Sequence, residues 1–199
     1  MGRVIALQPK DWLAIFDLDG TLFDTTAVNY HAYREALEAY GFPLDYDYFR
    51  QHCNGRYYMD FLPQITTRDE ATLQAMHLIK QDSYAKHLNR AVPNAHLFRM
   101  LRLMRAQYHT AVVTTASRIN CMQLLDAFEV TPLFDLIVTR EDYQKVKPDP
   151  EGFCLAMDRF GITPQNTLIF EDSEPGAEAA RRSGAQCLRV TEGFAYGDA

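Results

Sequence analysis

The sequence predicts an α/β fold: a parallel sheet with helices on both faces, interrupted early by a block of helices. Short apolar runs alternate with segments of helical periodicity along most of the chain, and this alternation is typical of parallel sheets. Residues 27–90 break the pattern because they contain no convincing strand. We therefore expect a core domain of residues 1–26 and 91–199, with an all-helical domain of residues 27–90 inserted into one of its loops.

The expected strands are short and apolar. The first is Trp-Leu-Ala-Ile-Phe at residues 12–16, and its five mostly apolar residues predict a buried strand. The second is the β-branched run Thr-Ala-Val-Val-Thr at residues 110–114. Further strands are expected at residues 134–138, 167–170 and 186–190.

Four helices are expected in the core domain. Three of them show apolar stripes at helical spacing, namely Leu97, Phe98, Leu101 and Met104; Cys121, Leu124, Leu125 and Phe128; and Phe153, Ala156, Met157 and Phe160. Pro150 suits the start of the third helix and Gly161 its end. The fourth is expected between the capping residue Ser173 and Gly184.

The inserted block is expected to contain several helices of different length. Residues 24–26 offer capping side chains for a helix that stops near Gly41. Short aromatic-rich pieces follow over residues 46–61, with a turn at residues 54–56. Residues 67–70 then fit a capping box that opens a long polar helix reaching about Leu88.

Composition excludes several classes of function. The formal net charge of -6 argues against nucleic acid as a partner, because phosphate backbones select basic surfaces. The four cysteines are far apart and are expected to be reduced, and the dispersed histidines show no zinc-binding spacing. No apolar run approaches the length of a membrane span, so we expect a cytoplasmic protein without a membrane partner.

Polar residues follow three of the predicted strands: Asp17 and Asp19, Thr114 and Thr115, and Glu171 and Asp172. Parallel sheets bind ligands beyond the carboxyl ends of their strands. In extended backbone, residues two apart point to the same side, so the first two carboxylates can converge on one point. Four acidic groups in one crevice repel unless a hard divalent cation binds there, most simply Mg²⁺. A magnesium site with open positions normally receives a phosphate.

The same crevice is expected to contain groups that bind a phosphate. Gly20 permits a sharp turn after the first strand. A threonine hydroxyl and adjacent backbone amides can hold phosphate oxygens. One lysine would balance the remaining charge, and Lys147 is the best candidate because Pro148 and Pro150 stiffen its segment. Lys145 is the nearby competitor.

Together these residues resemble the phosphatases of the haloacid dehalogenase superfamily that carry a helical cap between their first and second motifs. The group includes phosphoglycolate phosphatase and β-phosphoglucomutase. Its four motifs appear in order as Asp17-Leu-Asp19-Gly20-Thr21, Thr114, Lys147-Pro148, and Glu171-Asp172-Ser173 with Gly176. The resemblance spans essentially the whole chain and implies a Rossmann-like core with a cap. It also implies a hydrolase that releases phosphate from phosphomonoesters with Mg²⁺ as cofactor.

The resemblance implies a role for each motif residue. Asp17 would be the nucleophile that forms an aspartyl-phosphate, and Asp19 the general acid and then the general base. Thr114 would hydrogen-bond the transferring phosphoryl group and Lys147 would stabilise its charge. Magnesium would be ligated by Asp17, the carbonyl of Asp19 and Asp172, with Glu171 acting directly or through water. Gly20 and Thr115 are further candidates for contact with the substrate.

Other activities of the superfamily remain as alternatives. Dehalogenases lack the second aspartate, so Asp19 argues against them. Phosphonate hydrolases use a cap lysine as a Schiff base, but Lys80 and Lys86 lie in a polar helix and are expected to be solvated.

A sugar-phosphate mutase of the β-phosphoglucomutase type is the closest enzymatic rival. It commonly has Val where this chain has Thr21 and carries a histidine where this chain has Asn29, with His31 two residues further. A non-catalytic phosphate-binding protein is the other alternative. The intact set of motif residues speaks against it.

The expected substrate is a small phosphorylated metabolite, since a cap restricts access to the crevice. Gly55 and Arg56, in the predicted turn of the cap, are expected to approach it, and Arg56 could recognise a second anionic group or pair with Asp60. The aromatic residues Tyr57, Tyr58 and Phe61 are expected to pack in the core of the cap. A monomer or weak dimer is expected.

Overall fold

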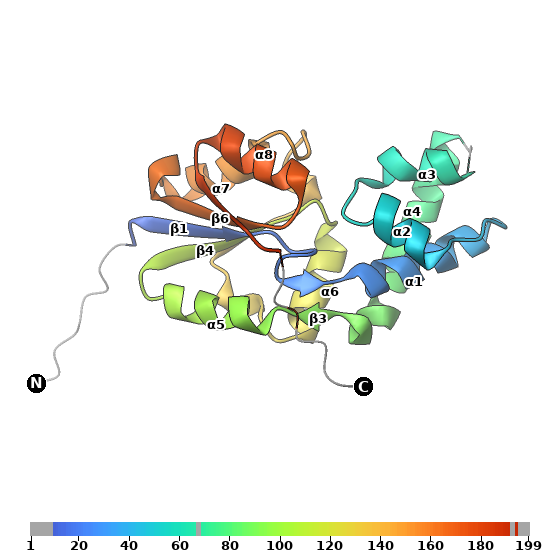
Figure 1. Ribbon diagram of the computed structural model, residues 1–199, viewed down its shortest axis with the longest axis horizontal. Coiled ribbons are helices and arrows are strands. Elements are labelled where there is room, and N and C mark those ends of the chain that lie inside the picture. Colours follow the sequence, from blue (N-terminus) through green and yellow to red (C-terminus); the bar gives the residue numbers. More distant parts are fainter. Residues whose placement is uncertain (1–9, 67–68, 192–193, 195–199) are drawn as a thin grey trace, which may run out of the picture.

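A five-stranded parallel sheet forms the centre of the computed structural model, which describes residues 10–66, 69–191 and 194 (Figure 1). The strand order is β5-β4-β1-β6-β7, and every pairing in the sheet is parallel. All five predicted strands are present, so the predicted α/β fold class is confirmed. The strands are β1 (Trp12–Phe16), β4 (Tyr108–Val113), β5 (Leu136–Val138), β6 (Thr167–Glu171) and β7 (Gln186–Arg189).

Helices cover both faces of this sheet (Figure 1). They are α5 (Ala95–Met104) and α6 (Arg118–Ala127) on one face, and α7 (Glu151–Phe160) and α8 (Glu174–Ser183) on the other. All four were expected from their apolar stripes and capping residues. Three short 3-10 helices lie in the connections, at Thr131–Leu133, Arg140–Asp142 and Pro164–Asn166.

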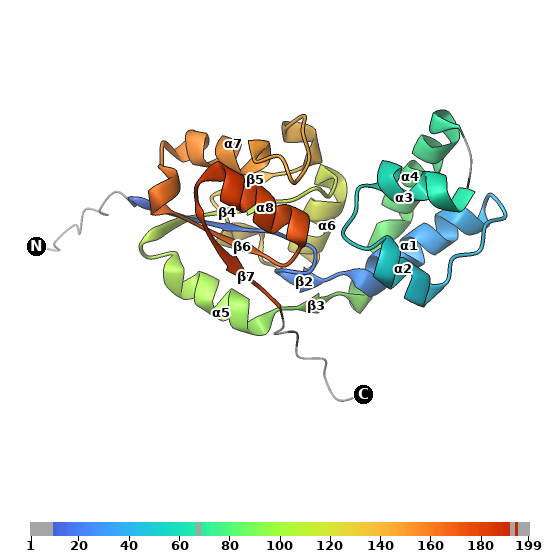
Figure 2. The same cartoon turned by 45° about the horizontal axis from the view of Figure 1, so that its top comes forward.

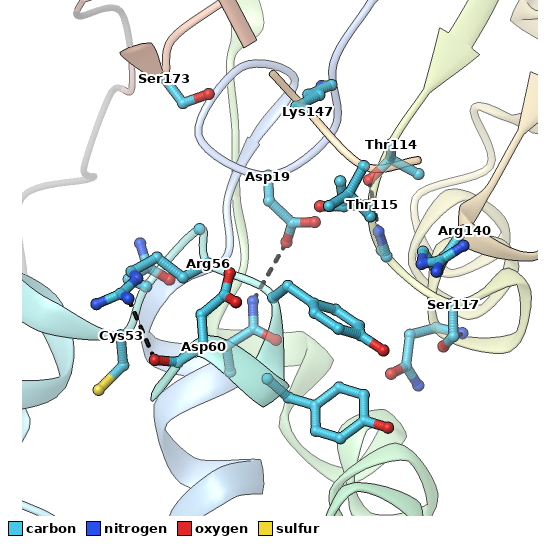
Figure 3. Close-up of a pocket in the computed structure, with 18 of the residues that line it drawn as sticks. Asp19, Cys53, Arg56, Asp60, Thr114, Thr115, Ser117, Arg140, Lys147 and Ser173 are labelled. Carbon is cyan, nitrogen blue, oxygen red and sulfur yellow. Dashed lines mark hydrogen bonds between the residues drawn. The ribbon is translucent and has the colours of Figure 1, made fainter. Parts of the chain in front are cut away.

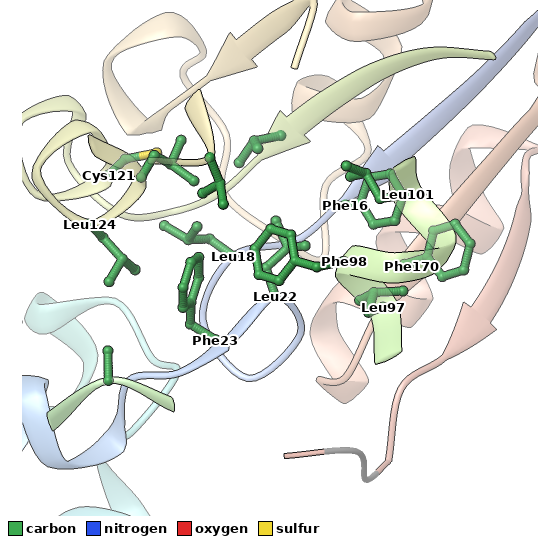
Figure 4. Close-up of a cluster of buried hydrophobic side chains, with 14 of the residues drawn as sticks. Phe16, Leu18, Leu22, Phe23, Leu97, Phe98, Leu101, Cys121, Leu124 and Phe170 are labelled. Carbon is green, nitrogen blue, oxygen red and sulfur yellow. The ribbon is translucent and has the colours of Figure 1, made fainter. Parts of the chain in front are cut away.

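The alternation of side chains along β1 divides the hydrophobic core into two layers. Leu13 and Ile15 point toward α7 and α8, whereas Ala14 and Phe16 point toward α5 and α6. Figure 4 shows the layer on the side of α5 and α6, in which Phe16 stacks on Phe170 of β6 with ring centroids 4.6 Å apart. Because both faces of β1 are fully buried, the end of this strand is held firmly in place.

Residues 26–90 form a helical block beside the carboxyl edge of the sheet (Figures 1 and 2). Its elements are α1 (Thr26–Glu38), α2 (Tyr46–His52), α3 (Tyr58–Thr66), α4 (Glu70–Tyr84) and the 3-10 helix η1 (Ala85–Arg90). The block has its own hydrophobic cluster, which includes Leu37, Phe49 and Phe61. Among its described residues there is no strand, as the sequence predicts.

The start of α4 differs in detail from the predicted capping box. The N-cap is Asp69, whose side chain accepts from the N–H of Thr72 at 3.0 Å. The proposed capping residue Thr67, like Arg68, lies outside the described residues. Aspartate is as good an N-cap as threonine, so the helix begins two residues later than the box implies.

A short antiparallel ribbon joins the block to the core and was not predicted. It pairs β2 (Phe23–Asp24) with β3 (Val92–Pro93), and Figure 2 shows it between the sheet and the block. Asn94 reinforces the ribbon, because its N–H donates to the carbonyl of Leu22 at 2.9 Å. The chain therefore leaves the core and returns to it at adjacent positions.

Two further expectations can be compared with the structure. The four cysteines form no disulfide, as expected. None of the described helices combines the length and apolar character needed to cross a membrane.

Candidate active site

Carboxylates gather where β1 and β6 end. Asp17 directly follows β1, and its N–H donates to the carbonyl of Phe170 at 3.0 Å, which extends the pairing of the two strands. Glu171 ends β6 and Asp172 comes next. One oxygen from each of these three carboxylates lies within 4.8 Å of the other two. The structure thus brings together acidic residues that are more than 150 positions apart in the sequence.

The ammonium group of Lys147 lies among these carboxylates. Its Nζ donates to Asp17 Oδ1 at 2.5 Å and to Glu171 Oε2 at 2.7 Å. The competing candidate Lys145 has a side chain that is 73% exposed, and its Nζ lies 3.9 Å from Asp149. Lys147 is therefore the lysine that the structure places at the carboxylates.

Burial and repulsion make two of the carboxylates easier to protonate. Burial, followed by the charge of Glu171, raises the pKa of Asp17 well above its usual value, although Lys147 opposes the rise. Burial and Glu171 likewise raise the pKa of Asp172 to about 6. For Glu171 burial acts in the same direction, but Lys147 and Ser173 outweigh it and lower the pKa. The group as a whole carries more negative charge than its surroundings balance.

This excess charge fits a divalent cation. When all three carboxylates are ionised, the single positive charge of Lys147 leaves two negative charges uncompensated. Leaving such charges buried is costly. Carboxylate oxygens are also the ligands that Mg²⁺ prefers. The acidic group is therefore a suitable site for a hard divalent cation, and the fit comes from both its charge and its donor atoms.

Two glycines lie so close to the carboxylates of Asp172 and Glu171 that a side chain at either position would overlap them. Gly20 has a φ of +89°, and a Cβ at this position would lie 2.2 Å from Oδ2 of Asp172. A Cβ at Gly176, in the first turn of α8, would lie 2.0 Å from Cδ of Glu171. Thr21 holds the other oxygen of Asp172, since its hydroxyl donates to Oδ1 at 2.9 Å. Residues of the first and fourth motifs thus fit against each other.

At Gly176 we predict a change in stability opposite to the one that helix propensity alone predicts. A glycine-to-alanine change inside a helix normally stabilises by up to about 1 kcal/mol. We expect Gly176→Ala to destabilise instead, by about 1–3 kcal/mol, because the new methyl group overlaps the carboxylate of Glu171. Thermal and denaturant unfolding of the two proteins would measure this difference. Glu174→Ala, an exposed position in the same turn, is the control; equal stability of Gly176→Ala and the unsubstituted protein would contradict the prediction.

Asp19 is oriented by the first turn of α1 rather than by the acidic group. Its Oδ1 accepts hydrogen bonds from the hydroxyl of Thr25 and from Nδ2 of Asn29, the latter at 3.2 Å. Figure 3 shows the carboxylate of Asp19 at the cavity, with the second of these bonds as a dashed line. Asn29 occupies the offset at which the mutases carry a histidine. His31 stacks on His87, with ring centroids 5.3 Å apart, and is not among the described residues that line the cavity at this edge of the sheet.

Thr114 directly follows β4 and is almost fully buried. Its hydroxyl oxygen accepts from the N–H of Ala116 at 3.0 Å. A hydroxyl that accepts in this way can still donate its own hydrogen. Thr115 also lies at the cavity, as Figure 3 shows beside Lys147 and Asp19.

A cavity of about 670 Å³ lies between the carboxyl edge of the sheet and the helical block. Asp17, Lys147 and Asp172 line it from the core, and Gly55, Arg56 and Lys80 line it from the block. Gly20 is not among the described lining residues, so its expected contact with the substrate stays a prediction.

The side chain of Arg56 bonds to the backbone of its own segment. Its two terminal nitrogens donate to the carbonyls of His52 at 2.9 Å and Asp60 at 3.2 Å, and Figure 3 shows the second of these bonds. The pairing with Asp60 therefore uses the main chain of that residue. Contact of Arg56 with a substrate stays a prediction.

The aromatic residues that follow Arg56 divide between core and cavity. Phe61 is buried in the hydrophobic cluster of the block, as expected. Tyr58 packs against the same cluster, as expected, but Tyr57 and Tyr58 both line the cavity, which was not expected. The guanidinium of Arg140, from the core, lies 5.6 Å from the ring centroid of Tyr57.

One expectation about the block was wrong. Lys80 was expected to be solvated, but it is only 7% exposed and contributes to the cavity wall. Its Nζ donates to Oδ1 of Asn120 on α6 at 3.2 Å. Lys86 has a 66% exposed side chain and pairs with Glu35 at 3.1 Å, as expected for a surface lysine.

Sequence reasoning missed several residues that shape the site. Thr25 and Asn29 orient Asp19, and their spacing of four on the first turn of a helix was a signal that could have identified them. Asn120 and Arg140 carried no comparable signal, because they reach the cavity only through the packing of the core against the block.

Comparison with known proteins agrees with the predicted resemblance. The family model described as haloacid dehalogenase-like hydrolase matches residues 14–190. The phosphorylated carbohydrates phosphatase of Thermotoga maritima is 28% identical over 178 residues, which cover 86% of this chain and 81% of that protein. The fructose-1-phosphate phosphatase of Escherichia coli is 29% identical over 179 residues, which cover 88% of this chain and 94% of that protein.

A solved structure shows the same fold. The β-phosphoglucomutase of Clostridium difficile superposes with a TM-score of 0.77 at 21% identity, covering 90% of this chain and 84% of that one. A match over nearly the whole chain, with all four motifs meeting at one edge of the sheet, fulfils the expectation drawn from the sequence. The chain belongs to the haloacid dehalogenase-like hydrolase family.

Proposed function

We propose that this protein is a magnesium-dependent phosphatase that hydrolyses small phosphorylated metabolites through an aspartyl-phosphate on Asp17. One observation carries the proposal: the carboxylate of Asp17 faces a cavity, is held by Lys147 at 2.5 Å, and has Asp172 and Glu171 beside it. The names of the relatives support the substrate class, since both are phosphatases of phosphorylated carbohydrates or sugars.

The first step transfers the phosphoryl group to the enzyme. A carboxylate oxygen of Asp17 attacks phosphorus and forms a bond to it, while the bond from phosphorus to the ester oxygen breaks. Asp19 donates its proton to the departing oxygen, so that the product leaves as a neutral alcohol. The contacts of Asp19 with Thr25 and Asn29 support this role, because they fix the carboxyl group on the cavity side of the turn.

The second step releases phosphate. Asp19, now a carboxylate, removes a proton from a water molecule, and the resulting hydroxide attacks phosphorus. The acyl phosphate bond to Asp17 breaks, which regenerates the nucleophile and yields inorganic phosphate. Each step uses the same proton-transfer residue, so no further acid or base is required.

Other residues of the chain stabilise charge on the phosphoryl group. The ammonium of Lys147 neutralises part of that charge, and the hydroxyl of Thr114 donates to a phosphoryl oxygen. Thr115, Gly20, Gly55 and Arg56 contribute contacts to the phosphate or to the leaving group. In this scheme the helical block of residues 27–90 is a cap domain, which excludes water from the cavity.

Magnesium would be held by the side chains of Asp17 and Asp172 and the carbonyl of Asp19. Both oxygens of Glu171 accept hydrogen bonds within the chain, from Lys147 and from Ser173 at 2.7 Å. We therefore assign Glu171 a contact with the ion through water. When bound, the ion supplies positive charge that offsets the charge on phosphate oxygens and on the carboxylates.

A metal-dependence experiment tests the proposed function. We expect the protein to release phosphate from an aryl phosphate in the presence of Mg²⁺, and to lose at least about 100-fold in rate with excess chelator, since the buried carboxylates otherwise repel the phosphate. Addition of Mg²⁺ in excess of the chelator should restore the rate. Full activity without divalent cations would contradict the role of the metal, and inactivity across a panel of metabolite phosphates would favour a phosphate-binding protein.

The mutase alternative predicts a different product. Its fold is shared, as the likeness to a β-phosphoglucomutase shows, but Asn29 stands where the mutase histidine is expected. With β-glucose 1-phosphate as substrate, we expect inorganic phosphate and glucose. Formation of glucose 6-phosphate would support the mutase instead.

A further inference from the structure

Lys80 is a buried ammonium group, and none of the described carboxylates is in direct contact with it. The residue is 7% exposed, lies on α4 of the helical block, and contributes to the cavity wall. Within the described part of the chain no carboxylate oxygen lies within 4.0 Å of its Nζ. Burying an ammonium group costs several kcal/mol unless an opposite charge compensates.

The groups given as contacts of Nζ of Lys80 are polar or aromatic but neutral. Its Nζ donates to Oδ1 of Asn120 at 3.2 Å and lies 4.5 Å from the ring centroid of Tyr84 and 5.3 Å from that of Tyr33. His77, one turn earlier on the same helix, is held neutral because burial lowers its pKa to about 4. An ammonium group has three hydrogens to donate, and one hydrogen bond to Asn120 leaves donors for another acceptor.

The position of Lys80 indicates which part of a substrate it would meet. The carboxylate of Asp19 lies close enough for its charge to oppose the effect of burial on the pKa of Lys80. In the proposed reaction Asp19 protonates the leaving oxygen. Lys80 lines the cavity from the helical block, whereas Asp17 and Lys147 line it from the core, and we infer that the leaving alcohol extends toward Lys80.

We propose that Lys80 binds a second anionic group on the leaving alcohol, so that the preferred substrates are phosphomonoesters that also carry a carboxylate or a second phosphate. This inference rests on the proposed phosphatase function. A negatively charged group in the cavity supplies the missing counter-ion, and the neutral surroundings of Nζ make the pairing stronger than it is at a surface. Asn120 fixes the ammonium for this contact.

Matched pairs of esters test the proposal. We would compare carboxyalkyl phosphates containing one to three methylene groups with the hydroxyalkyl phosphates of the same length, and add the alkanediol bisphosphates as a second arm. We expect kcat/KM to be at least tenfold higher for the anionic member of the best pair. In Lys80→Met this ratio should fall at least tenfold, whereas in Lys86→Met, which changes the exposed lysine, it should stay the same.

Other outcomes would overturn the proposal. If Lys80 only ties α4 to α6, then Lys80→Met and Asn120→Ala will lower kcat/KM for both members of a pair equally. A ratio near one in the unsubstituted protein would also overturn it. If no ester is hydrolysed, the proposed function fails, and calorimetric binding of the same pairs still decides whether Lys80 discriminates the anionic member. Methionine has nearly the volume of lysine, and thermal unfolding would confirm that the variant folds.

Discussion

Replacement of Asp17 by Asn is expected to abolish phosphate release, by a factor of at least about 10⁴ in kcat, while the protein remains folded. An amide nitrogen or oxygen cannot replace the carboxylate as nucleophile. The fold should tolerate the change because the carboxylate lies in an unfavourable environment, as the upward shift of its pKa by burial and by Glu171 indicates. Steady-state release of phosphate and a thermal unfolding curve would measure both parts.

A control variant separates the chemistry of Asp17 from a general effect of charge. Asp158 is exposed on α7 and is not among the described residues that line the cavity, so Asp158→Asn should keep full activity. The protein would react briefly with substrate, be denatured, and then be analysed by mass spectrometry. We expect a phosphorylated form of the unsubstituted protein and none of Asp17→Asn. Substantial turnover by Asp17→Asn would show that another residue is the nucleophile.

Replacement of Lys147 by Met is expected to affect activity and stability together. The lysine contacts Asp17 at 2.5 Å and Glu171 at 2.7 Å, and the side chains on both sides of these contacts are buried. Removing one partner of a buried ion pair typically costs about 3–5 kcal/mol, because the remaining charges are left uncompensated. Loss of its positive charge should also lower kcat by about 10²–10³-fold.

Lys145→Met provides the comparison for this prediction. Its ammonium is exposed and lies 3.9 Å from Asp149, a geometry that contributes less than about 1 kcal/mol. Denaturant unfolding with chelator present, so that no cation substitutes for the lysine, would measure the difference between the two variants. Equal stability and equal activity of both variants would mean that the contacts of Lys147 have no energetic importance.

The strands of the core and the position of the carboxylates at one edge of the sheet could be predicted from the sequence, because both follow from local patterns. Residues 12–16 are an almost continuous apolar run, which predicts a strand buried on both faces, and the structure buries Leu13 and Ile15 on one face and Ala14 and Phe16 on the other. The polar residues after each strand could then be placed at one edge, since parallel strands all end there. The positions of Asp17 and Asp172 needed no knowledge of long-range packing.

The prediction was wrong where burial depends on distant elements. The helix that contains Lys80 reads as polar, and a polar helix normally exposes its lysines. Lys80 is buried because α4 packs against α6 and brings it to Asn120, 40 positions away. The ribbon of β2 and β3 escaped detection for a related reason. Each strand has only two residues, so no periodicity exists, and the pairing itself is the only evidence for them.

Because β2 pairs with β3, the helical block is an insertion whose two ends lie side by side. We call it a module in this sense. Its two ends meet at one ribbon, so a different block can replace residues 25–91 without rethreading any strand of the sheet. The carboxylates and Lys147 lie outside this segment, whereas Gly55, Arg56 and Lys80 lie within it. In the proposed function, a change within this segment therefore alters contacts to the leaving group and leaves Asp17, Lys147 and Asp172 in place.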